Sequence, residues 1–525
     1  MYKITLLALN FMEKGTPELA MHLLKAFFLK YSSYKSFVEI QILQFSKNTK
    51  KEVIIQKILE TNPNLIGFSC YMWNINIILE VSKLIKENHK GIEIVLGGPE
   101  VSPQDEEILS KNKFIDYIIR GEGEESFKEL VECIIEKKCK SCVSGLSYNQ
   151  DGTIFINSKR TVIKDLDDIP SPYLEGVITQ SKYFEKTACL ETMRGCPFKC
   201  AFCYDYKDYE GMRYHSLRRI EDEFKFILKR APKFLYIMDP TFNANTKRAK
   251  EILRLFIKYN KNTKLHVELK AELLDEEMIF LLDKANSVAI EIGLQTINSK
   301  TLKLINRHFD SNRFKENLKL LKRYEQKRNF LISIIYSLPF EGYNDLKNSV
   351  DYAISLQPSS ISLFKLSVIP GTVLWKDSKK LSLDYEKNSP YYVIREDEEY
   401  NKNVSFLVFG VLTIYNNQLL RKTLLYLYEQ HNIAPSEILE EFFVFVKECY
   451  NKNDNINSLI PIDFAKHIVQ ERNLDDLEIV RIVRAECLDI IKKFNIDINH
   501  LILYNLSTFE KDGIQNLPYS YLQFK

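Results

Sequence analysis

The amino-acid sequence predicts an α/β protein with a doubly wound (Rossmann-like) domain, a partial (β/α)6 barrel of the TIM type and a helical C-terminal domain. Short β-branched runs alternate with helical patterns twice, once before residue 140 and once after residue 187. After about residue 386 glycine nearly vanishes and helical periodicity dominates. The chain has 525 residues, more than one hydrophobic core usually supports, so several domains are expected.

Residues 1–140 are predicted to form the doubly wound domain. Between its third and fourth strands, Ile77, Val81, Leu84 and Ile85 recur at helical spacing, as a crossover helix requires. The alternation of strands and helices predicts a parallel sheet. The predicted strands cover Ile4–Leu9, Phe37–Leu43, Leu65–Phe68, Ile92–Leu96 and Phe114–Ile119.

The loops after three of these strands form a candidate binding site, because ligands of such sheets bind beyond the carboxyl ends of the strands. The loops read "SCYMWN" (69–74), "GGPEVS" (97–102) and "GEGEES" (121–126). Their glycines let the backbone approach a bulky ligand, and their aromatic residues offer flat apolar faces. The alternative is that glycine and proline only shape the turns. The loop after the first strand lacks a G-x-G-x-x-G fingerprint, which disfavours NAD.

Residues 141–186 are predicted to be a linker, in which "GLSYNQDGTIFINSK" indicates a hairpin with an Asp-Gly turn. Residues 187–385 predict the barrel, whose chemistry is expected at the C-terminal ends of the strands. Ser216 can cap a helix over residues 217–230. The predicted barrel strands cover residues 187–192, 234–238, 264–268, 287–292, 331–336 and 360–366.

Residues 386–525 are predicted to form the helical domain. Its apolar stretch Val404–Tyr415 is shorter than the roughly 20 residues that a membrane span needs, so we expect a buried helix and no membrane span. Ile4–Leu9 is too short for a signal-peptide core, and ten scattered cysteines suit a reducing, cytoplasmic setting. The 73 basic and 70 acidic residues are interleaved, which disfavours nucleic acid as a partner.

The segment "RGCPFKCAFCYD" (194–205) holds three cysteines with the spacing C-x-x-x-C-x-x-C. Three thiolates fill only three corners of a metal site. One possibility is structural zinc, with His215 as the fourth ligand. The other is a 4Fe-4S cluster in which one iron stays open to a substrate or cofactor.

This segment resembles the signature of the radical S-adenosylmethionine (radical SAM) enzymes, C-x-x-x-C-x-aromatic-C, through Cys196, Cys200, Phe202 and Cys203. The resemblance implies that the three cysteines hold a 4Fe-4S cluster. It also implies that the open iron binds S-adenosylmethionine, which is cleaved to methionine and a 5′-deoxyadenosyl radical, and that Phe202 packs near the adenine.

Later strand ends extend the resemblance. "YIMDPTFNAN" (236–245) would place Asp239 near the methionyl part of S-adenosylmethionine, and "EIGLQTINSKTLKLINR" (291–307) would bring Glu291 and Gln295 to its ribose or methionine moiety. The alternative for these three residues is a polar side chain satisfied at a strand end. "SLPFEG" (337–342) and "VIPGT" (368–372) resemble the fifth and sixth strand ends, although Ser337 stands where a glycine is usual.

The order of the segments resembles the cobalamin-binding radical SAM enzymes. The motif Asp-x-His-x-x-Gly, which coordinates cobalt from below in another type of cobalamin module, is absent, and His22 fits packing better than ligation. The C-terminal domain resembles that of uncharacterised members through "SPYYVI" (389–394). The residues that the resemblance assigns to cobalamin are Ser69, Tyr71, Trp73, Gly97, Gly98, Pro99, Glu100, Gly121 and Glu122.

The resemblance implies a methyltransferase that acts on an unactivated carbon through the deoxyadenosyl radical and methylcobalamin. The alternative is a rearrangement, cyclisation or ring contraction with the same cofactors, and a third possibility is a non-catalytic sensor. No residue is assigned as a catalytic acid or base. The expected partners are a small-molecule, lipid or peptide substrate and an electron donor such as flavodoxin or ferredoxin.

Overall fold

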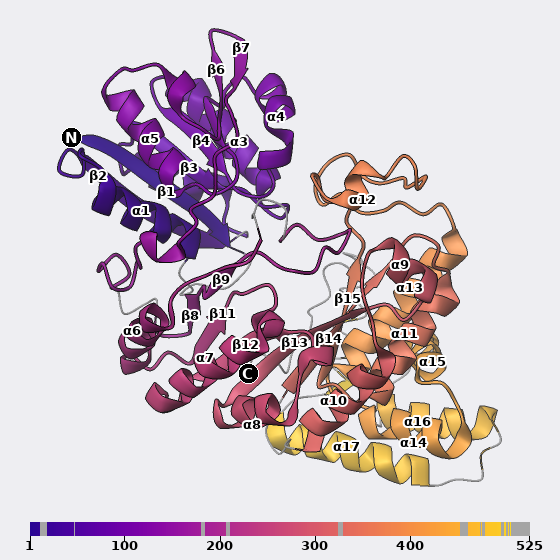
Figure 1. Ribbon diagram of the computed structural model, residues 1–525. Coiled ribbons are helices and arrows are strands. Elements are labelled where there is room, and N and C mark those ends of the chain that lie inside the picture. Colours follow the sequence, from indigo (N-terminus) through magenta and orange to yellow (C-terminus); the bar gives the residue numbers. More distant parts are fainter. Residues whose placement is uncertain are drawn as a thin grey trace. The chain divides into compact units, whose positions relative to one another are not determined.

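The computed structural model shows two compact units within the chain (Figure 1). Unit 1 comprises Met1–Val288, Ile305–Arg307 and Ser367–Tyr392, and unit 2 comprises Ala289–Leu304, His308–Leu366 and Val393–Lys525. The structure describes all residues except 11–17, 47, 180–183, 206–210, 324–328, 452–459, 473, 475–477, 495–497, 500, 501, 503, 504 and 506–525.

The first sheet lies in unit 1 and has seven strands in the order β2-β1-β3-β4-β5-β6-β7. The first five strands run parallel, and the chain reverses its direction of winding between β1 and β3. The predicted doubly wound sheet is therefore confirmed. The strands are β1 (Tyr2–Asn10), β2 (Val38–Ser46), β3 (Leu65–Ser69), β4 (Glu93–Gly97), β5 (Tyr117–Ile119), β6 (Leu146–Gln150) and β7 (Thr153–Ile156).

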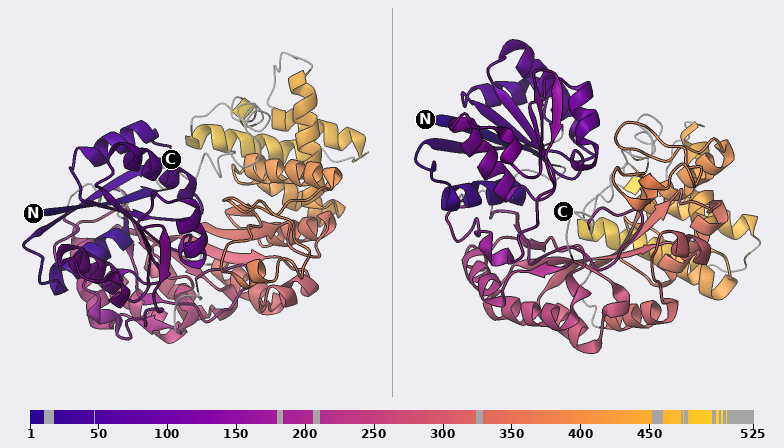
Figure 2. Two further views of the ribbon diagram at one scale, coloured as in Figure 1. Left: turned by 90° about the horizontal axis from the view of Figure 1, so that it is seen from above. Right: turned by 45° about the horizontal axis from the view of Figure 1, so that its top comes forward.

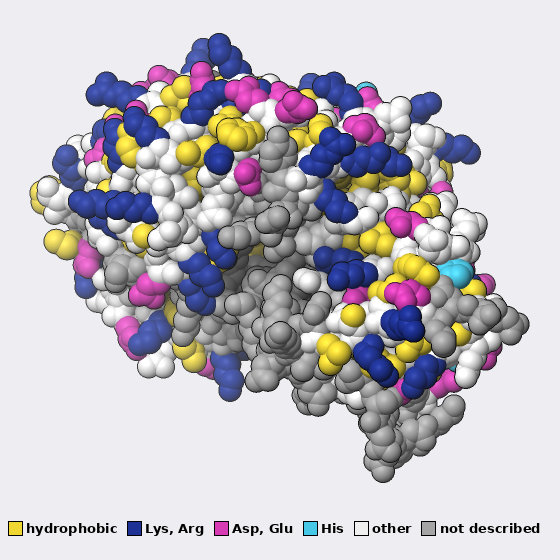
Figure 3. Space-filling view, turned by 90° about the horizontal axis from the view of Figure 1, so that it is seen from below, with side chains coloured by type: hydrophobic (Ala, Val, Ile, Leu, Met, Phe, Trp, Pro, Cys, Tyr) yellow, Lys and Arg dark blue, Asp and Glu magenta, His cyan; other side chains and the backbone are white. Residues whose placement is uncertain are grey.

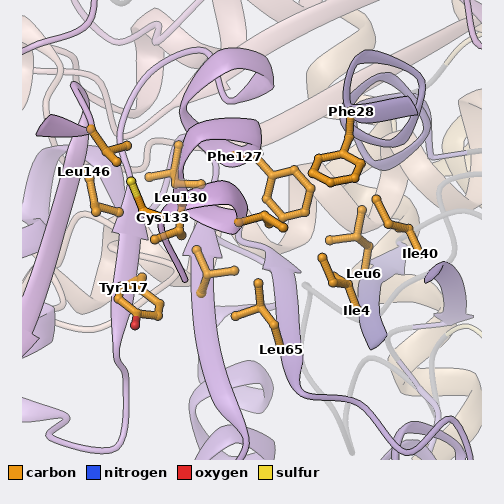
Figure 4. Close-up of a cluster of buried hydrophobic side chains, with 14 of the residues drawn as sticks. Ile4, Leu6, Phe28, Ile40, Leu65, Tyr117, Phe127, Leu130, Cys133 and Leu146 are labelled. Carbon is orange, nitrogen blue, oxygen red and sulfur yellow. The ribbon is translucent and has the colours of Figure 1, made fainter. Parts of the chain in front are cut away.

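Helices cover both faces of this sheet (Figures 1 and 2). In β1, Ile4 and Leu6 face the hydrophobic cluster that contains Phe28 and Phe127, while Leu7 faces the opposite cluster (Figure 4). This alternation follows from the two-residue period of a strand. The helices are α1 (Leu19–Tyr31), α2 (Lys51–Leu59), α3 (Ile75–Asn88), α4 (Asp105–Lys111) and α5 (Glu124–Ile135).

The predicted hairpin is β6 and β7, whose turn residues Asp151 and Gly152 have φ values of 53° and 86°. Two successive left-handed residues are what a type I′ turn needs, and Asp-Gly adopts them readily. β6 also pairs with β5 in antiparallel orientation, so the hairpin extends the first sheet.

The second sheet has six strands in the order β15-β14-β13-β12-β11-β8, which places β8 and β15 at its two ends. The described neighbour pairs within each unit are parallel, as the predicted partial barrel requires. Its strands are β8 (Thr187–Leu190), β11 (Phe234–Ile237), β12 (Lys264–Leu269), β13 (Ser287–Gln295), β14 (Asn329–Tyr336) and β15 (Ser360–Lys365).

The helices of this part follow the strands as expected for βα units (Figure 2). The predicted cap is present, since the Ser216 hydroxyl accepts a hydrogen bond from the Arg219 amide at 3.1 Å. A small antiparallel pair, β9 (Met193–Arg194) and β10 (Arg213–Tyr214), brackets the cysteines. The helices are α6 (Leu217–Lys229), α7 (Thr246–Tyr259), α8 (Glu276–Lys284), α9 (Ser299–Leu304), α10 (Ser311–Arg323), α11 (Tyr343–Ser355) and α12 (Val373–Lys376).

The C-terminal part of unit 2 is helical, as predicted. The apolar stretch Val404–Tyr415 continues from α13 into a π-helical turn over Val411–Tyr415, most of it buried. In the described part of the chain, no helix combines the length and the apolar character that crossing a membrane demands. The helices are α13 (Glu398–Gly410), α14 (Arg421–His431), α15 (Pro435–Asn451), α16 (Ile460–Glu471) and α17 (Glu478–Phe494).

The close packing of α13 on α15 makes a prediction for Gly410. A Cβ atom at this position would lie 2.7 Å from both Cβ and the carbonyl oxygen of Leu439. We expect Gly410→Ala to lower the free energy of unfolding by about 1–3 kcal/mol, because the two helices must move apart. Urea unfolding followed by circular dichroism measures this change. Gly91→Ala is the matched control, since nothing lies within 4 Å of its added Cβ; equal stability of the two variants would contradict the packing argument.

Candidate active site

The cysteine loop (residues 194–205) follows β8 and holds the three predicted ligands. Cys200 is buried, and Cys196 and Cys203 are half-buried. The Cys196 Sγ lies 3.6 Å from the Thr241 hydroxyl, and the Cys203 Sγ donates to the Asp205 carboxylate at 3.2 Å. Burial raises the pKa of the Cys196 and Cys203 thiols, and metal ligation would remove these protons.

The tripeptide Ile305–Arg307 clamps the cysteine loop and belongs to unit 1, although the residues on either side of it belong to unit 2. The Ala201 amide donates to the Ile305 carbonyl at 2.8 Å, and the Asn306 amide group donates to the Lys199 carbonyl at 2.9 Å. The Arg307 guanidinium donates to the Cys200 Sγ at 3.8 Å. The tripeptide therefore fixes both the backbone of the loop and one of its thiols.

The zinc alternative depends on His215, and this side chain has other contacts. His215 is buried, with Nδ1 3.4 Å from an Asp167 carboxylate oxygen and Nε2 3.6 Å from a Glu191 carboxylate oxygen. Both ring nitrogens therefore face carboxylates. In the described residues no group of three or more His, Cys, Asp or Glu side chains, the three cysteines included, is arranged to hold a metal ion as the side chains stand, so the case against zinc rests on the contacts of His215.

A donor set of three thiols with an open corner is the kind that suits an iron-sulfur cluster. Half-buried Phe202 lies between the second and third cysteines. Near the loop, Lys270 Nζ lies 5.2 Å from the centre of the Phe198 ring and 2.8 Å from a Glu272 carboxylate oxygen. Lys270 is thus paired with a carboxylate, whereas the Arg307 guanidinium lies against a cysteine sulfur, where a positive charge fits a negatively charged thiolate.

A buried ion network joins the loop after β5 to the start of the cysteine loop. Arg194 is 7% exposed and pairs with Glu122 at 3.2 Å, with Glu124 at 2.7 Å and with Glu191 at 2.9 Å. Arg213 donates to Glu122 at 3.1 Å. Burial alone would raise the pKa of Glu191, but Arg194 and the neighbouring histidine lower it to about 2. Each buried charge is thus compensated by an opposite one.

Asp239, at the end of β11, faces the backbone that precedes the cysteine loop. Its carboxylate accepts hydrogen bonds from the Thr192 amide at 2.8 Å, from the Met193 amide at 3.2 Å and from the Thr192 hydroxyl. Asp239 is 1% exposed, and burial raises its pKa to about 6 although the Thr192 hydrogen bonds oppose this shift. The side chain positions the loop; its predicted contact with a methionyl group stays a prediction.

A cavity of about 390 Å³ opens beyond the carboxyl ends of β1, β3, β4 and β5, where the sequence predicts a ligand. Six glycines are among its lining residues, so a bulky ligand can approach the backbone at these positions. Gly195, Tyr204 and Asp205 of the cysteine loop line the same cavity. The residues predicted for cobalamin that line it are Ser69, Tyr71, Gly97, Gly98, Pro99, Gly121 and Glu122.

Two other residues predicted for cobalamin do not line this cavity. Trp73 is 45% exposed and stacks on Tyr71, with ring centroids 4.4 Å apart and an interplanar angle of 6°. Glu100 is buried and accepts a hydrogen bond from the Tyr391 hydroxyl. Burial raises the pKa of Glu100, although the hydrogen bond from Tyr391 opposes that rise. Glu100 thus fixes the loop after β4 through its bond to Tyr391 and does not line the cavity.

Gly98 shows why the loop after β4 needs a glycine. Its φ is 112°, and a Cβ atom here would lie 2.5 Å from the carbonyl oxygen of Cys70. No side chain can replace the hydrogen at this position without moving the backbone. His22, in contrast, is 2% exposed with Nδ1 2.7 Å from the Glu18 carbonyl, as packing predicts.

The remaining predicted residues lie on β13 in unit 2. Glu291 is half-buried, and Gln295 ends the strand with a φ of 70°. Among the described residues, the Gln295 side-chain oxygen is buried without a hydrogen-bond partner. Such an unsatisfied acceptor at a barrel strand end fits a residue that binds a polar ligand.

Ser337, the departure from glycine, adopts the glycine-like conformation with a φ of 63°. Its amide donates to the Tyr400 hydroxyl of the C-terminal helical part at 3.0 Å. The bond to Tyr400 helps to hold this serine in a conformation that costs about 1–2 kcal/mol for a residue with a Cβ. Ser337 therefore adopts the left-handed backbone conformation that a glycine at this position would adopt without strain.

Sequence reasoning missed Arg307, Arg194 and Tyr391 as residues of the site. Arg307 and Arg194 both lie in quoted motifs, at the end of "LKLINR" and at the start of "RGCPFKC". An arginine at the edge of a cysteine motif is a signal that could have been used, because thiolates and carboxylates need cationic partners. Tyr391 carried no such signal, since its contact with Glu100 spans 291 positions.

Two parts of the chain match known protein families. Residues 190–353 match the radical SAM superfamily, and residues 15–131 match the B12 binding domain. The first match contains the three cysteines and Asp239, and the second contains the loops after β3, β4 and β5. A radical SAM domain implies a 4Fe-4S cluster and S-adenosylmethionine, and a B12-binding domain implies cobalamin.

Three relatives show the range of similar proteins. An uncharacterized methyltransferase of Pyrococcus horikoshii is 24% identical over 61% of this chain and 71% of its own length. The cobalamin-dependent radical SAM methyltransferase TokK of Streptomyces tokunonensis is 30% identical over 34% of this chain and 28% of its own. An anaerobic magnesium-protoporphyrin IX monomethyl ester cyclase of Rubrivivax gelatinosus is 24% identical over 56% and 55%. The chain spans less than two thirds of the last two relatives.

The solved structure of the cobalamin-dependent S-adenosylmethionine radical enzyme OxsB, with aqua-cobalamin and S-adenosylmethionine bound, has the same fold. The comparison covers 98% of this chain and 84% of OxsB, with a TM-score of 0.66 and 17% sequence identity. It therefore extends the similarity in fold to the helical C-terminal part.

The raised pKa of buried Asp239 predicts how the free energy of unfolding depends on pH. Its pKa in the folded protein, about 6, lies above the ordinary value of 3.8, so the stability it contributes is complete below pH 3.8 and is lost as the pH rises through 6. Asp239→Asn keeps an acceptor for the Thr192 and Met193 amides but cannot ionise. We expect the free energy of unfolding of this variant to fall less than that of the parent between pH 4 and 7, by roughly 2 kcal/mol.

Urea unfolding at a series of pH values measures this difference between the variant and the parent. Asp222→Asn is the control, because this aspartate is 43% exposed and pairs with Lys225 on the surface of α6. If Asp239→Asn and the parent showed parallel pH profiles, Asp239 would not be the group that titrates.

Proposed function

We propose that this chain, which belongs to the cobalamin-binding radical SAM enzymes, is a methyltransferase that attaches a methyl group to an unactivated carbon atom. One observation carries the proposal: Gly195, Tyr204 and Asp205 of the cysteine loop line the same cavity as Gly97 and Gly98 of the B12-binding part. Two reagents held at these two walls would face a common space, and a substrate between them could react with both in turn.

The chain's own residues would bind and orient these groups. Cys196, Cys200 and Cys203 would hold the cluster, and the glycines beyond β4 and β5 would cradle the corrin. When bound, the cluster and S-adenosylmethionine supply a carbon-centred radical, and cobalamin carries the methyl group. The ion pairs of Arg194 connect the loop after β5 to the cysteine loop, which fixes the relative positions of the two walls of the cavity. The similarity to methyltransferases supports the reaction type.

Counting the products of S-adenosylmethionine tests the proposal. We expect the reconstituted, reduced protein to form one S-adenosylhomocysteine and one 5′-deoxyadenosine for each methylated product. Incubation with methyl-labelled S-adenosylmethionine, cobalamin and an anaerobic cell extract, followed by mass spectrometry, detects labelled products. Products that carry no added methyl group would refute the methyl transfer while leaving the cofactors in place.

Substitution of the three cysteines tests whether they hold the cluster. Replacing Cys196, Cys200 and Cys203 with alanine should abolish the iron-sulfur absorbance and 5′-deoxyadenosine formation, because no thiolates remain to hold the irons. Cobalamin binding, measured by its visible spectrum, should persist, because the glycine-lined wall is intact. Cys139→Ala with Cys142→Ala is the matched control, since both cysteines are exposed. Loss of iron from the control and not from the triple variant would show that other residues hold the cluster.

A second candidate is a rearrangement or cyclisation with the same cofactors. It is favoured by the similarity to an anaerobic cyclase, which covers 56% of this chain. This reaction type would yield 5′-deoxyadenosine without S-adenosylhomocysteine. The same product count therefore separates the two candidates.

A further inference from the structure

A basic hollow of about 910 Å³ borders the cysteine loop in unit 1. Its wall includes Cys196, Pro197 and Lys199, and the last two are exposed, so the cysteine loop reaches the protein surface here. We use the name basic hollow for the cavity whose lining residues include 102, 103, 120–122, 159–162, 196, 197, 199 and 371, 373, 375 and 376.

The charge of the hollow is strongly one-sided. Among the residues that the structure describes, its lining carries one carboxylate, Glu122, and five basic side chains: Arg120, Lys159, Arg160, Lys199 and Lys376. Ion pairs neutralise the two arginines, with Asp105 at 3.2 Å and Glu125 at 3.1 Å, and Glu122 is paired with Arg194.

The three lysines of the hollow have no carboxylate partner among the described residues. Among the residues that the structure describes, no carboxylate pairs with Lys159, Lys199 or Lys376, and all three are exposed. Figure 3 shows basic and acidic side chains interspersed on the face that it draws. The lysines therefore form a local positive field in a chain whose net charge is only +3.

We propose that the basic hollow is the docking site for an acidic, one-electron donor protein of the flavodoxin type. The inference rests on the proposed function, because it needs a cluster held by Cys196, Cys200 and Cys203. In the docked complex the donor's flavin loses one electron and the cluster gains it, with no transfer of atoms. An acidic donor fits because charge complementarity steers association and orients the donor toward the exposed part of the loop.

Charge reversal at the two lysines that lie outside the cysteine loop tests this proposal. We expect Lys159→Glu with Lys376→Glu to lower the apparent second-order rate of cluster reduction by reduced flavodoxin about tenfold or more. The parent rate should fall as ionic strength rises, and the rate of the variant should lose this dependence. Stopped-flow absorbance under anaerobic conditions measures both.

The matched control is Lys90→Glu with Lys113→Glu, which makes the same change in net charge at exposed positions outside the hollow. Its rate should stay close to that of the parent. An unchanged rate in the Lys159 and Lys376 variant, or an equal loss in the control, would overturn the proposal. Dithionite gives the total amplitude in each sample; no bleaching with dithionite would mean no cluster and would count against the proposed function instead.

A second inference comes from the clamp on the cysteine loop. Arg307 donates to the Cys200 Sγ at 3.8 Å, and the clamp residue Asn306 holds the neighbouring backbone through the Lys199 carbonyl at 2.9 Å. The guanidinium is thus a fixed positive charge beside one predicted cluster ligand. We infer that Arg307 is a positioning residue that raises the reduction potential of the cluster, because a nearby cation and an N–H···S bond favour the more negative, reduced state.

Potentiometric titration monitored by electron paramagnetic resonance tests this inference without any substrate. Arg307→Gln should lower the midpoint potential, and a tenfold change in the reduction equilibrium corresponds to about 59 mV for one electron. Arg307→Lys should stay nearer to the parent because it keeps the charge. Iron and sulfide analysis confirms that each sample holds the same amount of cluster.

Asn306→Gly separates this electrostatic role from a purely structural one. It removes the bond to the Lys199 carbonyl and suits the φ of 51° at this position. If Asn306→Gly lowered the potential as much as Arg307→Gln, or if Arg307→Gln left the potential unchanged, the inference would be wrong.

Discussion

Arg194 makes the interaction on which the geometry of the site depends. This arginine is almost fully buried and contacts three carboxylates: Glu122 of the loop after β5, Glu124 at the start of α5, and Glu191 just after β8. A buried guanidinium is costly unless its donors are satisfied, and removing one partner of such a group leaves an uncompensated charge. The network therefore specifies one arrangement of the loop after β5 and the cysteine loop, and with it the shape of the cavity between them.

Glycine and carboxylate residues have complementary roles around this network. Gly98 lets the chain pass within van der Waals distance of the Cys70 carbonyl, and other glycines leave the cavity wall without side chains. Two carboxylates outside the cavity lining support the loops: Asp239 accepts hydrogen bonds from the backbone amides before the cysteine loop, and Glu100 accepts one from the Tyr391 hydroxyl. Glycines serve at the cavity lining because a ligand there needs space. Carboxylates serve in the support because they accept hydrogen bonds that fix the loops.

The cysteine loop receives support from distant parts of the chain. Ile305–Arg307 provides backbone and side-chain bonds to it, and the Leu374 amide donates to the Ala201 carbonyl at 2.9 Å. The loop also borders the basic hollow, where no described carboxylate pairs with three of the lysines. The cofactor cavity and the basic hollow share Ser102, Gly121, Glu122 and Tyr204, so the cysteine loop lies where the two spaces adjoin.

Periodicity and motifs in the sequence by themselves determined the two α/β sheets, the hairpin with its Asp-Gly turn, the Ser216 cap and the cysteine loop, because each depends on residues close together in the chain. The tertiary structure alone showed that Asp239 faces backbone amides, that Glu100 lies behind its loop with Tyr391, and that Arg307 reaches Cys200. These contacts join residues separated by 47 to 291 positions. Local patterns carry no information about such distant partners, since only the packed chain brings them within hydrogen-bond distance.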